Sequence, residues 1–271
     1  MRDADQAAQA PGSDGAAVAA LRYPRVLLKL SGEALAGQTK FGFDFERLNF
    51  FADQIVEVVR AGAEVGLVIG GGNIVRGAQL SGMGMERVGA DYMGMLGTVI
   101  NALALQDALE KRGLDTRVMT AIRMEELAEP YIRRRALAHL DQKRVVIFAA
   151  GTGNPYFSTD TAAVLRAIQI KADVIIKATS VDGVFSADPK QHPDARFYDT
   201  ISYRDVMIEE LRVMDQTAVT LSRENALPVI VLNAHRPGSV LRALRGEKEG
   251  TLVSDAAPNN TPAAPSAAVH P

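Results

Sequence analysis

The chain contains no cysteine, which excludes disulfide bonds, cysteine-ligated zinc and thiol catalysis. Histidine is sparse, and the four histidines show no metal-ligand spacing: His139, His192, His235 and His270. Any metal that the protein uses is therefore expected to be a hard ion held by oxygen atoms. A Ser-His-Asp order and an obvious acid/base pair of carboxylates are absent as well, so the sequence offers no clear proton-transfer catalyst.

A strong excess of either charge is also missing. The 30 Lys and Arg residues and 32 Asp and Glu residues are interleaved, for a formal net charge of −2. This balance argues against a basic nucleic-acid surface or a polybasic membrane patch. No apolar run approaches the roughly 20 residues of a membrane span, and Met1–Arg22 lacks the features of a secretory signal. We therefore expect a cytoplasmic protein with no nucleic-acid or membrane partner.

The two ends of the chain differ in composition from its middle. Residues 1–22 and 255–271 are rich in Ala, Pro and polar residues, which predicts disordered extensions. With 47% hydrophobic residues in a chain of 271, the remainder is long enough for a large core. We interpret residues 23–254 as one catalytic domain, in which two lobes meet near residue 170.

Short apolar runs alternate with amphipathic segments along this domain. The predicted strands are Arg25–Leu30, Glu64–Ile69, Arg117–Met119, Arg144–Phe148, Val174–Ala178 and Val229–Leu232. The first predicted helix follows Asp44, which is its N-cap. The others cover Ala90–Lys111, Thr161–Ile170, Arg204–Leu211, Asp215–Asn225 and Ser239–Arg245. This alternation predicts an α/β fold, a three-layer αβα sandwich around a mainly parallel twisted sheet.

The helix predicted over Ala90–Lys111 has an unusually broad apolar stripe. Met93, Leu96, Ile100 and Leu103 form it, which predicts burial on two sides. The second side could belong to the core or to a subunit interface, and the sequence leaves both open.

Three predicted strands end in glycine-rich loops, where sheets of this kind bind ligands. Lys29-Leu30-Ser31-Gly32 ends the first strand, and a lysine at a strand end points to an anion. Gly70-Gly71-Gly72-Asn73, followed by Arg76, lets backbone N–H groups approach a phosphate. Gly72 and Gly77 have P-loop spacing, but Ala78-Gln79 stand where Lys-Ser or Lys-Thr is required. The second loop is therefore a phosphate-loop candidate of another type.

The third loop, Ala150–Asp160, combines glycines, a proline, hydrogen-bonding side chains and two aromatic rings. That mixture favours recognition of a planar heterocycle, although Asp160 could simply cap the following helix. Lys177 ends another predicted strand, so two different strands deliver lysines to one edge of the sheet. Together these features predict a polyphosphate held between two ligand sites.

The motifs resemble those of the amino acid kinase family, whose members use ATP to phosphorylate carboxylates, carbamate or phosphates. The resemblance rests on Lys29-Leu30-Ser31-Gly32, Gly70-Gly71-Gly72-Asn73 and Lys177-Ala178-Thr179. Asp91-Tyr92-Met93-Gly94-Met95, Gly151–Asp160 and Val181-Asp182-Gly183-Val184-Phe185 resemble the bacterial uridylate kinase (UMP kinase) branch in particular. The similarity runs from about Arg25 to Val253. It implies an amino acid kinase-like fold and reversible transfer of the ATP γ-phosphoryl group to UMP, giving UDP and ADP, in pyrimidine nucleotide biosynthesis.

The resemblance also implies site residues. Catalysis would involve Lys29, Arg76, Asp160 and Lys177. ATP would contact Lys29, Leu30, Ser31, Gly32, Gly72, Arg76, Thr179, Phe185 and Asp188. UMP would contact Gly71, Asp91, Thr152, Gly153, Asn154, Pro155, Tyr156, Phe157, Ser158 and Thr159. A loop linked to GTP activation would comprise Gly37, Gln38, Thr39, Lys40, Phe41 and Gly42. Relatives are hexamers that UTP inhibits and that depend on Mg²⁺, which is expected to arrive on ATP without direct protein ligands.

This chemistry explains the shortage of acid/base groups. The second pKa of a phosphate monoester is about 6, so UMP is mostly a dianion at neutral pH and needs no base. The reaction needs alignment of two anions and neutralisation of charge. We hypothesise that Lys29, Arg76, Lys177 and Mg²⁺ neutralise it while Asp160 positions the lysines and the metal.

Two other functions remain open from the sequence. An amino-acid kinase of the same superfamily would need cations aimed at an α-carboxylate, whereas the Thr152–Thr159 loop offers neutral groups and rings. A nucleotide sensor would not need to keep all three phosphate-facing cations, Lys29, Arg76 and Lys177.

Overall fold

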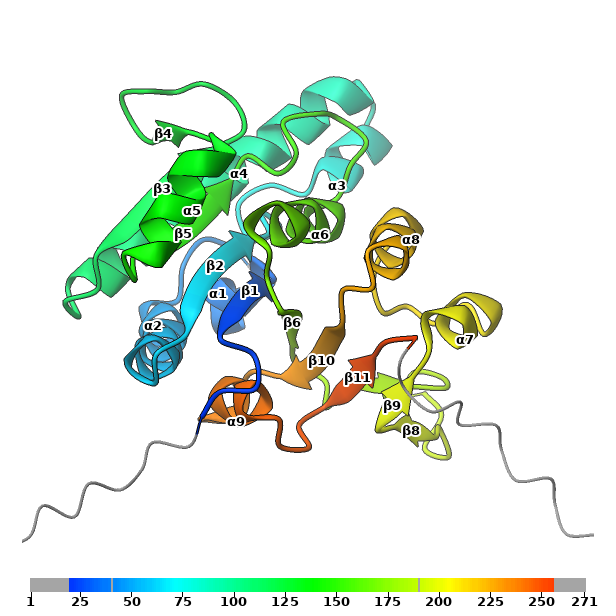
Figure 1. The fold of residues 1–271 in the computed structure, drawn as a ribbon. Helices are drawn as coiled ribbons and strands as arrows, with labels where there is room; N and C mark the ends of the chain where they lie inside the picture. Colours follow the sequence, from blue (N-terminus) through cyan, green and yellow to red (C-terminus); the bar gives the residue numbers. More distant parts are fainter. Residues whose placement is uncertain (1–19, 40, 190, 256–271) are drawn as a thin grey trace, which may run out of the picture.

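Strands rich in Val, Ile and Leu form a nine-stranded sheet through the centre of the molecule, in the order β4-β3-β5-β2-β1-β6-β10-β11-β9 (Figure 1). The computed structural model describes residues 20–39, 41–189 and 191–255. All neighbouring strands of this sheet are parallel except β10 and β11. Their bounds are β1 Arg25–Leu30, β2 Glu64–Ile69, β3 Thr116–Thr120, β4 Glu129–Pro130, β5 Val145–Ala149, β6 Val174–Thr179, β9 Thr200–Ile201, β10 Val229–Asn233 and β11 Thr251–Val253. A separate antiparallel pair joins β7, Val184–Phe185, to β8, Phe197–Tyr198.

Helices cover both faces of the sheet, which confirms the predicted three-layer sandwich. One hydrophobic cluster packs α1 (Glu33–Ala36), α2 (Phe45–Arg60), α4 (Arg87–Glu110) and α9 (Ser239–Arg245) on one face. A second cluster packs α5 (Arg133–Asp141), α6 (Thr159–Ile170), α7 (Tyr203–Ile208) and α8 (Gln216–Glu224) on the other. The 3₁₀ helix η1 (Gly37–Thr39) follows α1, and α3 (Gly77–Gly82) precedes α4.

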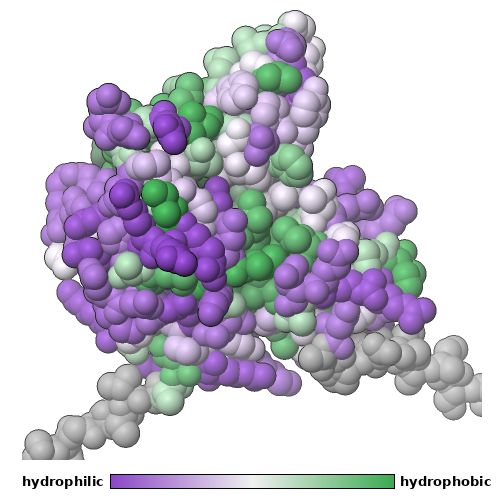
Figure 2. All heavy atoms as spheres, turned by 45° about the horizontal axis from the view of Figure 1, so that its top comes forward, coloured by the Kyte–Doolittle hydropathy of each residue, from purple (hydrophilic) through white to green (hydrophobic). Residues whose placement is uncertain are grey.

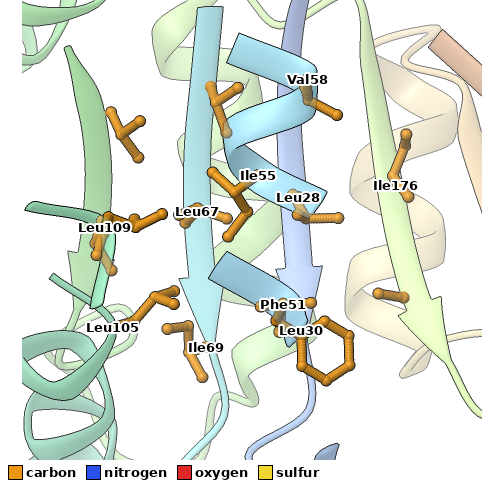
Figure 3. Close-up of a cluster of buried hydrophobic side chains, with 14 of the residues drawn as sticks. Leu28, Leu30, Phe51, Ile55, Val58, Leu67, Ile69, Leu105, Leu109 and Ile176 are labelled. Atoms are coloured by element: carbon orange, nitrogen blue, oxygen red, sulfur yellow. The ribbon is translucent and has the colours of Figure 1, made fainter. Parts of the chain in front are cut away.

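Alternation of side chains along the central strands decides which residues enter the core. On β1, Val26, Leu28 and Leu30 join the cluster under α2 and α4, whereas Leu27 joins the cluster on the opposite face. Figure 3 shows Leu28 and Leu30 packed with Phe51, Ile55 and Leu67. Because successive strand residues point to opposite faces, Lys29 lies on the same face as Leu27, which is the α6 side.

The predicted elements are found with small shifts at their ends. Asp44 caps α2, its carboxylate accepting from the N–H groups of Glu46 and Arg47. Helix α6 begins at Thr159 rather than Thr161, because Ser158 supplies the cap. Sequence reasoning missed α5, whose first turn is Arg-rich, and the short strands within residues 182–203.

The core of the chain covers only one side of the apolar stripe of α4. Met93, Leu96 and Ile100 are 38%, 51% and 45% exposed, so the alternative of burial in the core alone is wrong, and the alternative of a subunit interface stays a prediction. Among the described residues, α4 is the one helix long and apolar enough to cross a membrane by length and composition. Its other side carries Met95, Val99 and Leu105 into the core, and core helices pass the same test.

Strands before and after residue 170 occupy opposite halves of the sheet, meeting at the β1–β6 pair. At the edges of the described region, the Arg22 N–H donates to the Leu244 carbonyl oxygen at 2.9 Å, and Asp255 accepts from the Tyr203 N–H at 3.1 Å. The rest of both expected extensions lies outside the described residues.

Candidate active site

Two lysines from neighbouring strands share one carboxylate. Lys29 on β1 and Lys177 on β6 are register partners, so both side chains rise from the same face of the sheet. The Lys29 Nζ atom lies 2.7 Å from Oδ1 of Asp160, and the Lys177 Nζ atom lies 2.8 Å from Oδ2. Lys177 also donates to the Val213 carbonyl oxygen at 2.5 Å. The structure thus brings together three of the four predicted catalytic residues.

Asp160 is free to bind both lysines because a neighbour performs the capping. The Ser158 hydroxyl oxygen accepts from the N–H groups of Asp160 and Thr161 at 2.9 and 3.1 Å. Asp160 therefore stands in the first turn of α6, where the helix dipole also favours a negative charge. Ser158 in turn donates to Asp215, which caps α8. This chain of contacts fixes the position of Asp160 relative to the lysines.

Burial and mutual attraction set the charges of this cluster. Burial by itself would raise the pKa of the Asp160 carboxyl, but Lys29 and Lys177 outweigh it and hold that pKa below its ordinary value of 3.8. Burial lowers the pKa of Lys177, an effect that Asp160 opposes and Lys29 reinforces. The carboxylate is thus ionised at neutral pH and poorly suited to accept a proton.

Acid should remove the stabilisation that Asp160 supplies. The pKa of the Asp160 carboxyl is lower in the folded than in the unfolded state, so its charge stabilises the fold at pH values above the unfolded-state pKa. This stabilisation is lost as the pH falls through the folded-state pKa. We expect the difference in unfolding free energy between wild type and Asp160→Asn to be complete near pH 7 and to shrink below about pH 3.8. Urea unfolding at several pH values measures it, and a difference independent of pH would contradict the assignment.

Glycines allow the tips of β1 and β2 to touch. A Cβ atom on Gly32 would lie 2.4 Å from the Gly70 carbonyl oxygen, and one on Gly71 would lie 2.6 Å from the Gly94 carbonyl oxygen on α4. Asn73 and Asn101 pair their side-chain amides beside this contact, and Asn101 donates to the Gly70 carbonyl oxygen at 2.7 Å. Close backbone approach at this edge of the sheet is what glycine permits and larger residues prevent.

A cavity of about 550 Å³ opens next to the first loop. Ser31, Arg76 and Thr179 of the predicted ATP set line it. The Arg76 guanidinium lies 2.7 Å from the Glu33 carboxylate, across the same cavity. This cavity is hereafter the ATP-side cavity.

The structure brings only part of the predicted ATP set to this cavity. Leu30 is 1% exposed and belongs to the core, so its backbone alone is available to a ligand. Phe185 lies on β7, where its ring packs against Phe197 with centroids 5.1 Å apart. Neither Phe185 nor Asp188 lines the ATP-side cavity.

The segment expected to respond to GTP borders the ATP side. Gly37 lines the ATP-side cavity, and Phe41, 69% exposed, lines a neighbouring cavity that also contains Gly72 and Arg76. The Gly42 N–H donates to the Asn73 carbonyl oxygen at 2.8 Å, which joins this segment to the second loop. Lys40 lies outside the described residues.

A smaller cavity of about 240 Å³, hereafter the pyrimidine-side cavity, collects most of the predicted UMP residues. Its lining includes Gly71, Asp91, Thr152, Tyr156, Phe157, Ser158 and Thr159, whereas Gly153, Asn154 and Pro155 lie outside it. Asp91 on α4 accepts from the Tyr156 N–H at 2.8 Å, which ties the third loop to the helix.

Two functional candidates on this side were not found from the sequence. Arg87 lies 2.8 Å from Asp91, lines the cavity and places its guanidinium over the Tyr156 ring. Thr98 accepts the Ala150 N–H at 2.8 Å and holds the start of the loop. The sequence did contain a signal for Arg87, because Arg87 and Asp91 are spaced i and i+4 on a helix, the spacing of an ion pair. No sequence signal links Thr98 to Ala150.

The described residues contain no group of three or more His, Cys, Asp or Glu side chains placed to hold a metal ion. Both oxygens of Asp160, the carboxylate of the lysine cluster, already contact ammonium groups. These side chains therefore do not form a protein cage for Mg²⁺.

Strand-tip cations, a glycine-rich turn and paired cavities are features of a phosphate-transferring enzyme. The amino acid kinase family matches residues 24–233, which is most of the chain. The chain belongs to the amino acid kinase family and is a phosphotransferase.

Solved structures refine this assignment. UMP kinase from Bacillus anthracis is 46% identical, with 87% of this chain and 97% of that chain covered and a TM-score of 0.85. UMP kinase from Ureaplasma parvum is 36% identical, with 86% and 100% covered and a TM-score of 0.82. Uridylate kinase from Archaeoglobus fulgidus is 31% identical, with 84% and 99% covered and a TM-score of 0.66. Within the family the chain falls in the bacterial UMP kinase branch, as its motifs predicted.

Proposed function

We propose that the protein transfers the γ-phosphoryl group of ATP to UMP, giving UDP and ADP. The observation that carries the proposal is the Lys29–Asp160–Lys177 cluster and its connections. Ser31, two residues after Lys29, and Thr179, two residues after Lys177, line the ATP-side cavity. Ser158 and Thr159, next to Asp160, line the pyrimidine-side cavity. The cluster thus joins an ATP site to a UMP site.

In this reaction an oxygen of the UMP phosphate forms a bond to the γ-phosphorus as the bond to the β–γ bridging oxygen breaks. The electron pair of the broken bond leaves with ADP. The attacking phosphate has a second pKa of about 6 and is already a dianion at neutral pH, so no proton must be removed. This agrees with Asp160, whose oxygens are engaged by two ammonium groups and whose pKa is lowered.

The protein then contributes position and positive charge. Lys29 and Lys177 are aligned by strand register and held by one carboxylate, so their ammonium groups need little rearrangement as charge develops. Arg76, 48% exposed in its side chain and paired with Glu33, is the most exposed of the three cations. When Mg²⁺ is bound with ATP it supplies further neutralisation of phosphate charge. The described residues offer it no cage, so we assign it to the nucleotide.

UMP is the proposed acceptor because the cavity beside the third loop has few cations that could bind the α-carboxylate of an amino acid. Among the residues lining the pyrimidine-side cavity, Arg87 is the one cation, and its Nε atom donates to Asp91 at 2.8 Å. The remaining polar groups are neutral hydroxyls or belong to the backbone, beside the rings of Tyr156 and Phe157. Such a lining favours a sugar and a flat base over the α-carboxylate of an amino acid.

The test is UDP formation from UMP and Mg-ATP, compared with CMP, glutamate and aspartate as acceptors. We expect UMP to be the strongly preferred substrate. An inert UMP and a reactive amino acid would transfer the protein to another branch of the same family. Adding GTP or UTP to the same assay tests the proposed activation and inhibition.

We further infer a cytoplasmic, homohexameric enzyme of pyrimidine nucleotide biosynthesis. The exposed stripe of α4, with Tyr92, Met93, Leu96 and Ile100 each between 38% and 51% exposed, supports self-association. Figure 2 shows hydrophobic residues interspersed with polar ones toward the top of the molecule, the side on which α3 and α4 lie in Figure 1.

A further inference from the structure

A cavity of about 690 Å³ lies at the carboxyl end of β3, apart from the ATP-side and pyrimidine-side cavities. Its walls come from the end of β3, the β3–β4 loop, the start of α5 and the middle of α6. It shares Thr152 with the pyrimidine-side cavity and no residue with the ATP-side cavity. Its size is that of a small-molecule site. We call it the arginine cavity, after Arg123, Arg135 and Arg166 in its lining.

Arg166 is a buried cation without a carboxylate partner. It is 5% exposed, and its guanidinium carbon lies 3.8 Å from the centre of the Tyr131 ring. Its guanidinium donates to the neutral side-chain oxygen of Gln169 at 2.7 Å, and it forms no ion pair with any carboxylate of the described residues. An isolated buried charge is costly, and arginine cannot escape that cost by losing its proton. The arrangement lacks a negative group.

Two further arginines line the same cavity. Arg123 and Arg135 are exposed, and neither forms an ion pair within the described part of the chain. Two carboxylates are present as well, but Glu129 contacts His139 at 3.2 Å and lies 3.9 Å from Arg117, and Glu125 is exposed. Three arginines against two glutamates leave the lining with a net positive charge.

The backbone at the start of α5 adds donors to this cavity. Ile132, the N-cap residue, lines the cavity and provides no side-chain cap for the first N–H groups of the helix, although its carbonyl oxygen accepts from the Arg135 N–H at 2.9 Å. The first turn carries Arg133, Arg134 and Arg135, where acidic residues are usual. Adding positive charge to the positive end of a helix dipole is unfavourable unless an anion is nearby.

Two buried hydroxyls of the lining residues also lack partners. Thr120 is 1% exposed, and its Oγ1 atom has no hydrogen-bond partner in the structure. The Tyr131 hydroxyl, beside Arg166, is likewise buried without one. Unpaired buried hydroxyls are rare in folded proteins, and these two add to the polar character of the cavity wall.

We propose that the arginine cavity binds a small phosphate-type oxyanion through Arg166, Arg123 and Arg135. Bidentate contacts from arginine suit the tetrahedral oxygens of such an anion, and the buried guanidinium then gains the negative partner that it lacks. Thr152 faces both this cavity and the pyrimidine-side cavity, so occupancy acts on the loop that encloses the proposed acceptor.

The test compares phosphate binding by wild type, an Arg123→Gln/Arg135→Gln double variant and an Arg134→Gln control, using calorimetry at constant ionic strength. Arg134 is exposed in the same helical turn and does not line the cavity. We expect the double variant to bind phosphate at this site at least about tenfold more weakly and the control to match wild type. Phosphate bound near Lys29 contributes equally to all three proteins, so the comparison is independent of the proposed reaction. Both substituted arginines are exposed, and thermal unfolding checks that the variants fold.

A second titration with ribose 5-phosphate distinguishes the source of the anion. If ribose 5-phosphate binds wild type more tightly than phosphate does, and the double variant loses this binding, the natural ligand is a phosphoryl group on a larger molecule. If the two bind equally, the natural ligand is the free anion. Equal phosphate affinity in wild type and the double variant overturns the proposal, and so does an equal loss in the Arg134→Gln control. A carboxylate from a second copy is the competing occupant: absence of phosphate binding in wild type, with weaker self-association of the double variant on sedimentation, would establish it.

Discussion

Replacing Lys29 with alanine is expected to lower the turnover of UDP formation about 30- to 10³-fold. The ammonium group lies 2.7 Å from Asp160 at the end of β1, where the side chain is 10% exposed and little water can substitute for it. Loss of one preorganised electrostatic donor costs roughly 2–4 kcal/mol of transition-state stabilisation. Because the group acts on charge that develops during transfer, the fall should appear mainly in kcat.

The matched control for this experiment is Lys111→Ala. Lys111 also pairs with an aspartate, Asp107, at 2.6 Å, but its side chain is 70% exposed on the surface of α4. Exposed pairs of this kind contribute little, so turnover and stability should remain near wild type. Steady-state assays with saturating UMP and Mg-ATP measure both variants. A Lys29→Ala enzyme that turns over like wild type would remove Lys29 from the catalytic set.

Replacing Asp160 with asparagine is expected to be the most destabilising single change in the site. The substitution keeps the shape of the side chain but leaves two ammonium groups, on Lys29 and Lys177, without their shared counter-charge. Removing one partner from a buried charge cluster costs about 3–5 kcal/mol of unfolding free energy. For a domain of this size that corresponds to a fall in Tm of roughly 6–20 °C. Turnover should fall too, because the lysines lose the group that positions them.

Asp107→Asn provides the corresponding surface control, since the Asp107 side chain is 62% exposed. Thermal and urea unfolding of both variants, with and without UMP, separate loss of stability from loss of binding. If Asp160→Asn were as stable as Asp107→Asn, the ion cluster would not contribute to folding as its geometry indicates. Lost turnover with stability retained would assign Asp160 to catalysis alone.

The sequence predicted the central strands and their helices well because local patterns specify them. Val, Ile and Leu runs followed by glycine-rich loops defined β1, β2 and β5, and Asp44 was identified as a helix cap from its place before an apolar repeat. Strand alternation also separates Lys29 from Leu28 and Leu30, which places the lysine opposite the main core. Each of these features depends on residues close together in the chain.

Other features were missed because they join distant segments. Helix α5 begins with three arginines, a composition that gives no helix-start signal, and its position depends on packing Ala136 and Leu140 against the sheet. The sequence also left open what covers the second side of the α4 stripe, because periodicity shows that a helix has an apolar face and not what lies against it; the core of the chain does not.

By itself, the sequence determined that this protein has a parallel α/β core with cations and glycines at its strand ends, and its motifs indicated the family. These properties follow from local periodicity and from residue types at loop positions. Only the tertiary structure decided that Lys29, Asp160 and Lys177 form one ion cluster, that Asp91 holds the third loop, and that Arg166 is buried without an acidic partner in the part of the chain that the structure describes. The physical reason is that charge pairing and burial depend on strand register and helix packing, which bring together residues that are distant in the chain, such as Lys29 and Asp160.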